Sequence, residues 1–320
     1  MENILVSISC ITYNHEKFIA DAIDSFLMQE TNFKFEILIH DDASTDRTVD
    51  IIREYEKKYP DLIKTIYQTE NQYSKGVDVL QLNNERAKGK YLAICEGDDF
   101  WTKSNKLQKQ VDYMEKHPEC SLCVNAGNLV SASERKLISQ SRPSNKNKIF
   151  TVAETIEGGG GLFLTNSMLC LTKFVQNRPN FIENAPVGDY PLAINLALLG
   201  TVYYIDEFMS AYRVGDSSSW TARNLSSIDK KIRHFNEIAE MLDEINQYTN
   251  FQYNNVITRT KNRNQFSLLL EQRRYKEVRI EEFKDIYLEL GYKSRIIIFM
   301  GQYYPCILRF MISAKKKLTR

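Results

Sequence analysis

The stretch FEILIHDDASTDRTVDII, residues 35–52, joins a short apolar run to a polar turn and then to an amphipathic segment. Residues 35–40 are β-prone and are bounded by polar residues, so we predict a strand there. We expect a helix over residues 46–59, capped by Thr45 or Asp46 and closed by the proline that follows. The stretch therefore predicts one strand-to-helix unit of an α/β fold.

The neighbouring segments repeat this order. Residues 4–11 predict a strand, and the apolar spacing over 15–29 predicts a helix. Further strands are expected over 62–68 and 91–95, with a helix near 77–88 between them. Strands alternating with helices of this length indicate parallel βαβ units in an open sheet.

Beyond residue 100 the alternation is less regular. We expect a helix over 105–117, a strand over 121–125 and a loop over 131–148. The glycine-rich run EGGGGLF, 157–163, lacks the Gly-Lys-Ser/Thr ending of a phosphate-binding loop. It either lets backbone pass close to a bound molecule or forms a mobile loop. Residues 225–290 are charged and amphipathic, which predicts a helical extension.

Composition narrows the class of protein. The chain has 320 residues, and 42 Lys+Arg against 41 Asp+Glu leave a net charge of +1. Such a balance does not favour a nucleic-acid partner. The first residues show no signal peptide, and six scattered cysteines suit reduced thiols in the cytoplasm. Cys120 and Cys123 have no second pair, so a buried strand is favoured over a zinc site.

Polar clusters follow three of the predicted strands: TYNHE (12–16), DDAS (41–44) and EGDD (96–99). Ligands of open α/β sheets gather at the carboxyl ends of the strands, so the coincidence favours a site over three solvated turns. Tyr13 offers a face on which a base can stack, and Asp42 offers an acceptor for a base N–H.

Asp98 and Asp99 are adjacent carboxylates that repel each other unless a cation lies beside them. Their hard oxygen atoms suit Mg²⁺ or Mn²⁺ rather than zinc. A cation there would also neutralise a diphosphate. The clusters together predict a site for a nucleotide diphosphate.

The three clusters and their flanks closely resemble the donor half of family 2 glycosyltransferases, which have the GT-A fold. The resemblance runs in order over 4–118 and more weakly through 164–171, 187–200 and 211–220. Its main motifs are SISCITYNHEKFIADAIDSFLMQ, FEILIHDDASTDRTVDII and AKGKYLAICEGDDFW.

The resemblance implies an α/β protein with a GT-A fold: an open, mostly parallel nucleotide-binding sheet flanked by helices, with a helical C-terminal extension. The catalytic domain is expected over 1–222, with its donor half at about 1–118 and its acceptor half at about 119–222. The extension is expected over 223–320.

Site roles follow from the same resemblance. Asp99 is the expected direct ligand of Mn²⁺ or Mg²⁺, with Asp98 as a ligand near the donor ribose or sugar, and Glu96 is at a variable position. Asp189, in VGDY, matches the catalytic base, although an N-cap role remains open. Donor-binding roles are expected for Thr12, Tyr13, Asn14, Glu16, Asp42, Ser44, Lys75, Asp98 and Arg213.

The implied reaction is inverting transfer of a sugar from a nucleotide-diphosphate sugar, expected to be a UDP-sugar, to a hydroxyl of a saccharide or lipid-linked saccharide. The implied setting is bacterial surface-polysaccharide (capsule) biosynthesis. Gly215 departs from the family, where many relatives have a histidine, and Arg213, Asp216 and Ser217–Ser219 are candidate replacements.

Two alternatives remain open from the sequence. The first is a nucleotidyltransferase, but such enzymes usually carry a glycine-rich loop after the first strand, and CITYNHEKF has no glycine. The second is a non-catalytic nucleotide-sugar-binding protein, which only Gly215 favours.

The segment 295–320 is apolar and basic. Residues 296–314 are mostly apolar, but Pro305 and Arg309 interrupt them, which argues against a spanning helix. We expect a segment that lies on an anionic membrane surface through Lys315–Lys317, peripheral to the inner face of the cell membrane. A helix packed on the catalytic domain or on a second subunit of a homo-oligomer is the alternative.

Overall fold

A computed structural model of the chain describes residues 4–216 and 220–307. The chain divides into two compact units, residues 1–219 and 220–320.

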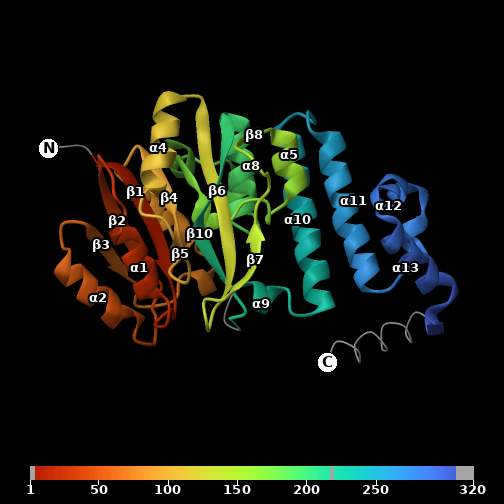
Figure 1. The fold of residues 1–320 in the computed structure, drawn as a ribbon, viewed down its shortest axis with the longest axis horizontal. Helices are drawn as coiled ribbons and strands as arrows, with labels where there is room; N and C mark the ends of the chain where they lie inside the picture. Colours follow the sequence, from red (N-terminus) through yellow and green to blue (C-terminus); the bar gives the residue numbers. More distant parts are fainter. Residues whose placement is uncertain (1–3, 217–219, 308–320) are drawn as a thin grey trace. The chain divides into compact units, whose positions relative to one another are not determined.

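The first part of the sheet is parallel, as the sequence predicts. Its strands are β1 (Ile4–Thr12), β2 (Lys34–Asp41), β3 (Ile63–Tyr67) and β4 (Tyr91–Ile94), in the spatial order β3-β2-β1-β4 (Figure 1). All pairs among them are parallel. Their carboxyl ends therefore lie along one edge of the sheet, which confirms the predicted open α/β sheet.

Beyond β4 the sheet becomes mixed. Strand β9 (Leu169–Leu171) is antiparallel to both β4 and β6 (Cys120–Ser131). Strand β10 (Thr201–Val214) runs parallel to β6 along most of its length. The short strands β5 (Phe100–Trp101), β7 (Leu137–Ser141) and β8 (Lys148–Phe150) add antiparallel pairs. Cys120 and Cys123 lie in β6 as buried free thiols, as predicted.

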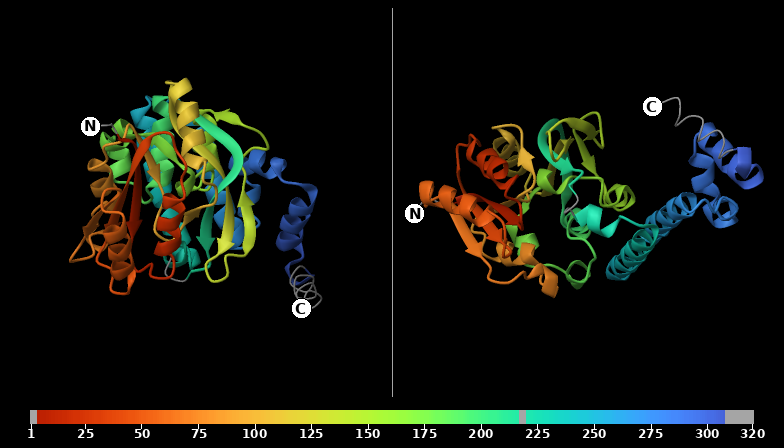
Figure 2. Two further views of the ribbon diagram at one scale, coloured as in Figure 1. Left: turned by 60° about the vertical axis from the view of Figure 1, so that its left-hand side comes forward. Right: turned by 90° about the horizontal axis from the view of Figure 1, so that it is seen from below.

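Helices cover both faces of this sheet. On one face, α1 (Ile19–Leu27), α2 (Thr48–Lys58) and α4 (Lys106–Lys116) pack on alternate residues of β1, β2 and β4. On the other face lie α3 (Val79–Glu85), α6 (Thr172–Gln176) and α8 (Asp189–Leu199). Figures 1 and 2 show these layers from three directions. The remaining short elements are η1 (Tyr73–Lys75), α5 (Val152–Gly158), η2 (Thr165–Ser167) and α7 (Asn180–Glu183).

Two predicted boundaries and one predicted loop are wrong. Helix α1 begins at Ile19 rather than near 15, because Asn14 has a φ of 56° and precedes a turn. Helix α2 begins at Thr48, although the Asp46 carboxylate accepts a hydrogen bond from the Thr48 N–H at 2.9 Å, as a capping residue does. The predicted loop 131–148 contains β7, an edge strand whose side chains are mostly exposed and so show no apolar alternation.

The second unit is helical, as predicted. Helices α10 (Ile228–Tyr248) and α11 (Asn254–Glu271) run alongside each other (Figures 1 and 2). The unit also contains α9 (Trp220–Asn224), η3 (Glu277–Arg279), η4 (Glu281–Phe283), α12 (Lys284–Glu289) and α13 (Tyr292–Tyr303). None of the helices in the described residues has the length and apolar character needed to cross a membrane. The predicted lipid contacts at Lys315–Lys317 lie outside the described residues.

Candidate functional site

Glu96 lies within electrostatic range of two other carboxylates, Asp98 and Asp189. Glu96 and Asp98 follow β4, and Asp189 begins α8. Burial, followed by the negative charges of Asp98 and Asp189, raises the pKa of Glu96 to about 8. Gly97 lets the turn pass β1, because a Cβ there would lie 2.7 Å from Oγ1 of Thr12. The structure thus brings together the three sequence clusters, 12–16, 41–44 and 96–99, and places the distant Asp189 near them.

Asp98 and Asp99 lie in different surroundings. Asp99 is buried, and its two oxygens accept hydrogen bonds from Asn166 Nδ2 at 2.9 Å and from the Arg213 N–H at 2.8 Å. Burial and the charge of Asp98 raise the pKa of Asp99. The Asp98 side chain is 28% exposed, and its Oδ2 lies 3.9 Å from Nε2 of His15. Asp98 therefore carries the more accessible carboxylate of the pair.

Arg213 lies behind this turn, with its side chain 2% exposed. Its Nη1 donates to the main-chain oxygen of Asp98 at 2.5 Å, and its Nη2 pairs with Asp21. The guanidinium also lies 5.0 Å from the ring centroid of Phe18 and 4.6 Å from that of Phe100. Burial lowers the pKa of Arg213. Instead of facing the carboxyl edge as a free phosphate ligand, the guanidinium is held within the protein.

Asp189 is partly exposed at the start of α8. Its Oδ1 accepts from the Tyr190 N–H at 2.7 Å, and its Oδ2 accepts from Oγ1 of Thr165 at 3.2 Å. Burial raises the pKa of Asp189. A carboxylate that is oriented by two donors and has a raised pKa can act as a general base.

Hydrogen bonds join the loop after β1 to the loop after β2. Asn14 Oδ1 accepts from the Thr45 N–H at 2.7 Å, and Glu16 Oε2 accepts from the Arg47 N–H at 3.1 Å. Ser44 Oγ accepts from the Asn14 N–H at 2.9 Å. Asn14, Glu16 and Ser44, which the sequence proposes as donor-binding residues, thus use these polar groups to join the two loops.

The other two residues of this region, Thr12 and Tyr13, differ in their exposure. Tyr13 is 38% exposed, and Oγ1 of Thr12 is buried without a hydrogen-bond partner among the described residues. A ring with an exposed face suits base stacking. Tyr13 therefore fits its expected place beside a nucleotide better than its neighbours do, whereas Thr12 is buried beneath the Gly97 turn.

Asp42 and Lys75 mark the side of the site formed by η1. The Asp42 oxygens accept from the N–H groups of Gln72 at 2.8 Å and Tyr73 at 3.0 Å. Lys75 is ion-paired with Glu70, and both side chains are more than half exposed. Asp42 thus fixes the loop that carries Lys75, whereas the Lys75 ammonium is engaged at the surface.

Sequence reasoning did not single out three residues that the structure places here. His15, next to Asn14, lies beside Asp98, and its Nδ1 is buried without a partner among the described residues. Thr165 and Asn166 hold Asp189 and Asp99. Both belong to LTNSMLCL, a weakly family-like segment that gave no signal for individual roles.

Gly215, at the position where many relatives have histidine, has a φ of 89°. A histidine would adopt this conformation only with strain, so glycine suits the local chain path. Asp216 has interactions of its own, and Ser217–Ser219 lie outside the described residues.

The carboxylate oxygens of this site are the type of ligand that a hard divalent cation prefers. Within residues 4–216 and 220–307, no group of three or more acidic, cysteine or histidine residues is arranged as a metal site. Mg²⁺, however, is usually bound by one or two carboxylates plus waters and substrate phosphates. The accessible Asp98 carboxylate, next to a Glu96 that its charge perturbs, meets that requirement.

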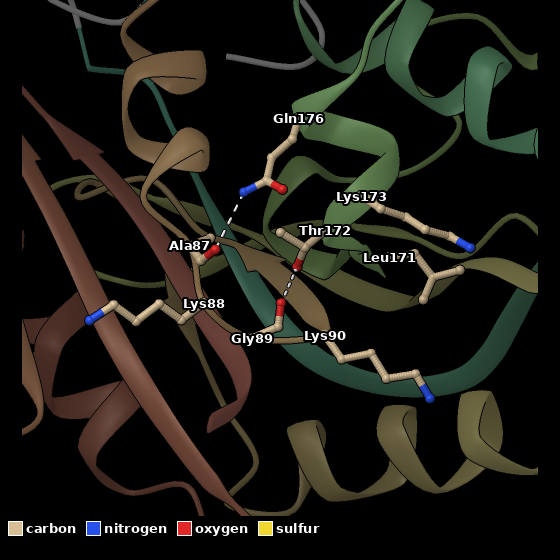
Figure 3. A pocket seen from close by; sticks show the side chains of 8 residues that line it. All are labelled: Ala87, Lys88, Gly89, Lys90, Leu171, Thr172, Lys173 and Gln176. Carbon is tan, nitrogen blue, oxygen red and sulfur yellow. Dashed lines mark hydrogen bonds between the residues drawn. The ribbon is translucent and has the colours of Figure 1, made fainter. Parts of the chain in front are cut away.

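A separate cavity of about 330 Å³ lies at the amino end of β4, away from these carboxylates (Figure 3). Gln176 and Thr172 donate to the carbonyls of Ala87 and Gly89, at 3.3 and 2.7 Å. The ammonium groups of Lys88, Lys90 and Lys173 point in different directions. Thr172 and Gln176 therefore support the backbone of this cavity, and its lysines do not converge on a ligand.

Comparison with known proteins identifies similar chains. The model of the family described as "Glycosyl transferase family 2" matches residues 7–168. An uncharacterised Mycobacterium tuberculosis protein is 33% identical over 221 residues, covering 67% of this chain and 60% of that protein. The chain thus spans about 60% of the length of its first relatives.

TuaG and WfaP are among the relatives that carry functional names. The teichuronic acid biosynthesis glycosyltransferase TuaG of Bacillus subtilis, itself a putative assignment, is 40% identical, covering 34% of this chain and 42% of TuaG. The UDP-Glc:α-D-GlcNAc-diphosphoundecaprenol β-1,3-glucosyltransferase WfaP of Escherichia coli is 37% identical, covering 35% of this chain and 41% of WfaP.

The fold is also found in a solved structure. Staphylococcus aureus TarS 1–349 in complex with UDP-GlcNAc aligns with a TM-score of 0.58 at 16% identity, covering 93% of this chain and 79% of that chain. At this identity the likeness concerns the fold alone, and it agrees with the predicted α/β architecture.

Proposed function

The chain belongs to glycosyl transferase family 2, and from this premise we propose that it is a glycosyltransferase that moves a sugar from a UDP-sugar to a hydroxyl acceptor with inversion. The observation that carries the proposal is the accessible Asp98 carboxylate after β4, together with an Asp189 carboxylate that Thr165 and the Tyr190 N–H hold at the start of α8. Family membership favours this reaction over the nucleotidyltransferase and non-catalytic alternatives.

For the donor, we assign the base to Tyr13 and the adjoining loops. The exposed Tyr13 ring supports stacking of the base. The hydrogen-bonded loops 12–16 and 41–48 would hold the Tyr13 ring in a fixed place. The names of WfaP and of the TarS complex, which mention UDP-sugars, support uridine.

We propose Asp98, rather than Asp99, as the carboxylate that holds Mn²⁺ or Mg²⁺. Both Asp99 oxygens accept hydrogen bonds from protein donors, whereas the Asp98 carboxylate is accessible. When bound, the cation would supply positive charge that stabilises the departing diphosphate. Asp99 would keep the turn in place.

Asp189 is proposed as the general base. Its raised pKa brings the carboxylate closer to the range in which it can accept a proton from an attacking hydroxyl. Thr165 and the Tyr190 N–H orient it without neutralising it. An in-line attack by that hydroxyl on an α-linked donor would give a β-linked product.

The acceptor and setting are proposed from the relatives. WfaP is named for a diphosphoundecaprenol-linked acceptor and TuaG for teichuronic acid biosynthesis, which supports a saccharide or lipid-linked saccharide acceptor in surface-polysaccharide biosynthesis. We propose that this chain acts on the same class of acceptor.

An apolar stripe on α13 supports docking at an anionic membrane surface. Tyr292, Ile296, Phe299 and Tyr303 are exposed and lie on one helical face, whereas Ile298 is buried in the core of its own unit. Residues 308–320 include three lysines and two arginines and no acidic residue. Apolar and basic groups together favour anionic lipid.

Flotation with liposomes tests this docking. Wild type should float with anionic but not neutral vesicles, and Ile296→Asp should lose flotation. Ile280→Asp, which changes an exposed isoleucine outside α13, is the matched control. Equal flotation of Ile296→Asp and wild type would disprove the surface. A concentration-dependent change in size without flotation would indicate a second copy instead.

A donor screen tests the sugar-transfer proposal. UDP-, GDP- and dTDP-sugars are added with Mn²⁺, with Mg²⁺ or with chelator, and thermal unfolding is followed. We expect UDP-sugars to raise the melting temperature only with a divalent cation. No stabilisation by any of these donors would overturn the proposed function.

A further inference from the structure

Asp21 and Arg213 connect helix α1 to the turn that carries the site carboxylates. Arg213 is near the end of β10, and Asp21 is in the first turn of α1. The Arg213 side chain is buried, and one of its terminal nitrogens pairs with Asp21 while the other donates to the main-chain oxygen of Asp98. The main chain of Arg213 also donates to Asp99.

The turn around Asp98 is thereby anchored from one side. Arg213 donates hydrogen bonds to the main-chain oxygen of Asp98 and to the side chain of Asp99. Asn166 donates to the other Asp99 oxygen and also to the Ala211 carbonyl. The Phe18 and Phe100 rings flank the guanidinium. A planar donor group in these surroundings has little freedom to move.

The buried guanidinium depends on Asp21. A buried charge that loses its partner is strongly unfavourable, so Arg213 would have to move without Asp21. Any such movement would release the Asp98 carbonyl and allow the turn to shift. The other Asp21 oxygen pairs with Arg135, whose side chain is 58% exposed and whose guanidinium lies 5.9 Å from the Phe100 ring centroid.

We propose that Asp21 is a positioning residue, which acts through Arg213 to hold Asp98 where it binds the metal–diphosphate group of the donor. This inference rests on the proposed function and deepens it. It assigns the arginine, which the sequence suggests as a phosphate ligand, to the support of the carboxylate. Asp21 itself touches neither donor nor acceptor in this account.

The experiment measures the Mn²⁺ concentration that gives half of the thermal stabilisation by UDP. Asp21→Asn and Arg213→Lys should raise this concentration by about tenfold or more, the scale expected when an outer-shell partner of a metal ligand is lost. Asp21→Glu should recover most of the loss. Arg135→Ala, which removes the exposed partner of the Asp21 carboxylate, should leave this half-stabilising Mn²⁺ concentration, the Mn²⁺ midpoint, unchanged.

The two proposals fail in different ways. If no nucleoside diphosphate stabilises the wild type with Mn²⁺, the proposed function is overturned and this inference with it. If the wild type responds and folded Asp21→Asn has the same Mn²⁺ midpoint, only the positioning role is overturned. If Asp21→Asn does not fold, Arg213→Lys, which keeps a cation beside Asp21, decides the question: an unchanged midpoint contradicts the inference.

Discussion

The hydroxyl of Thr165 donates a hydrogen bond to Oδ2 of Asp189 at 3.2 Å, and the Tyr190 N–H occupies the other oxygen at 2.7 Å. The carboxylate is thus held at the start of α8 by one donor from its own helix and one from η2. A residue serving only as a helix cap would not require the second donor. The arrangement therefore favours a role in chemistry.

Asp189→Asn should retain donor binding and lose transfer by ~10²-fold or more, because the amide keeps the size of the side chain but removes its basicity. Donor binding is measured by calorimetry and transfer by product formation. Near-normal turnover with normal binding would leave Asp189 as a helix-terminal residue only.

Asp98→Asn and Asp99→Asn should separate binding from stability. Asp98→Asn should abolish Mn²⁺-dependent donor binding with little change in melting temperature, because the side chain is partly exposed. Asp99→Asn should lower the free energy of unfolding by about 1–3 kcal/mol, since the amide keeps one buried acceptor oxygen and replaces the other with a donor that faces a donor. The opposite pattern, with Asp98→Asn unstable and Asp99→Asn defective only in metal binding, would reverse the assignment.

We expect the free energy of unfolding to depend on pH because of Lys106. The side chain is fully buried, its Nζ lies 4.3 Å from the Trp101 ring centroid, and Gln110 accepts its hydrogen bond at 2.8 Å. Burial lowers the pKa of Lys106 from 10.5 to about 7. Between about pH 7 and pH 10.5, Lys106 is protonated in the unfolded chain and neutral in the folded chain. The free energy of unfolding therefore rises with pH over this range, and the cost of burying the charged ammonium is fully present below about pH 7.

Lys106→Met should remove this penalty and raise the free energy of unfolding by about 1–4 kcal/mol at pH 6, the range seen when apolar residues replace buried ions. The gain should shrink by pH 9, where much of the penalty is gone. Urea unfolding of both proteins at the two pH values measures it. A gain of equal size at both pH values would show that Lys106 does not titrate on unfolding.

The sequence predicts the parallel strands because their buried residues form short apolar runs with polar ends. It misses β7, whose exposed side chains carry no such pattern. The family resemblance makes Asp99 the expected direct metal ligand, and only the structure shows that this aspartate is buried against Asn166 and Arg213. The role of Arg213 could not be predicted, because its partner Asp21 is brought to it by the packing of α1 near the end of β10.

The central claim is tested most directly by the product formed from a UDP-sugar, Mn²⁺ and a diphosphoundecaprenol-linked GlcNAc acceptor. NMR of the purified product reports the configuration at the new linkage, and the released nucleotide is measured in the same reaction. The account predicts release of UDP and a β-linked product, both dependent on the metal and on Asp189. An α-linked product, or release of pyrophosphate in place of UDP, would contradict it.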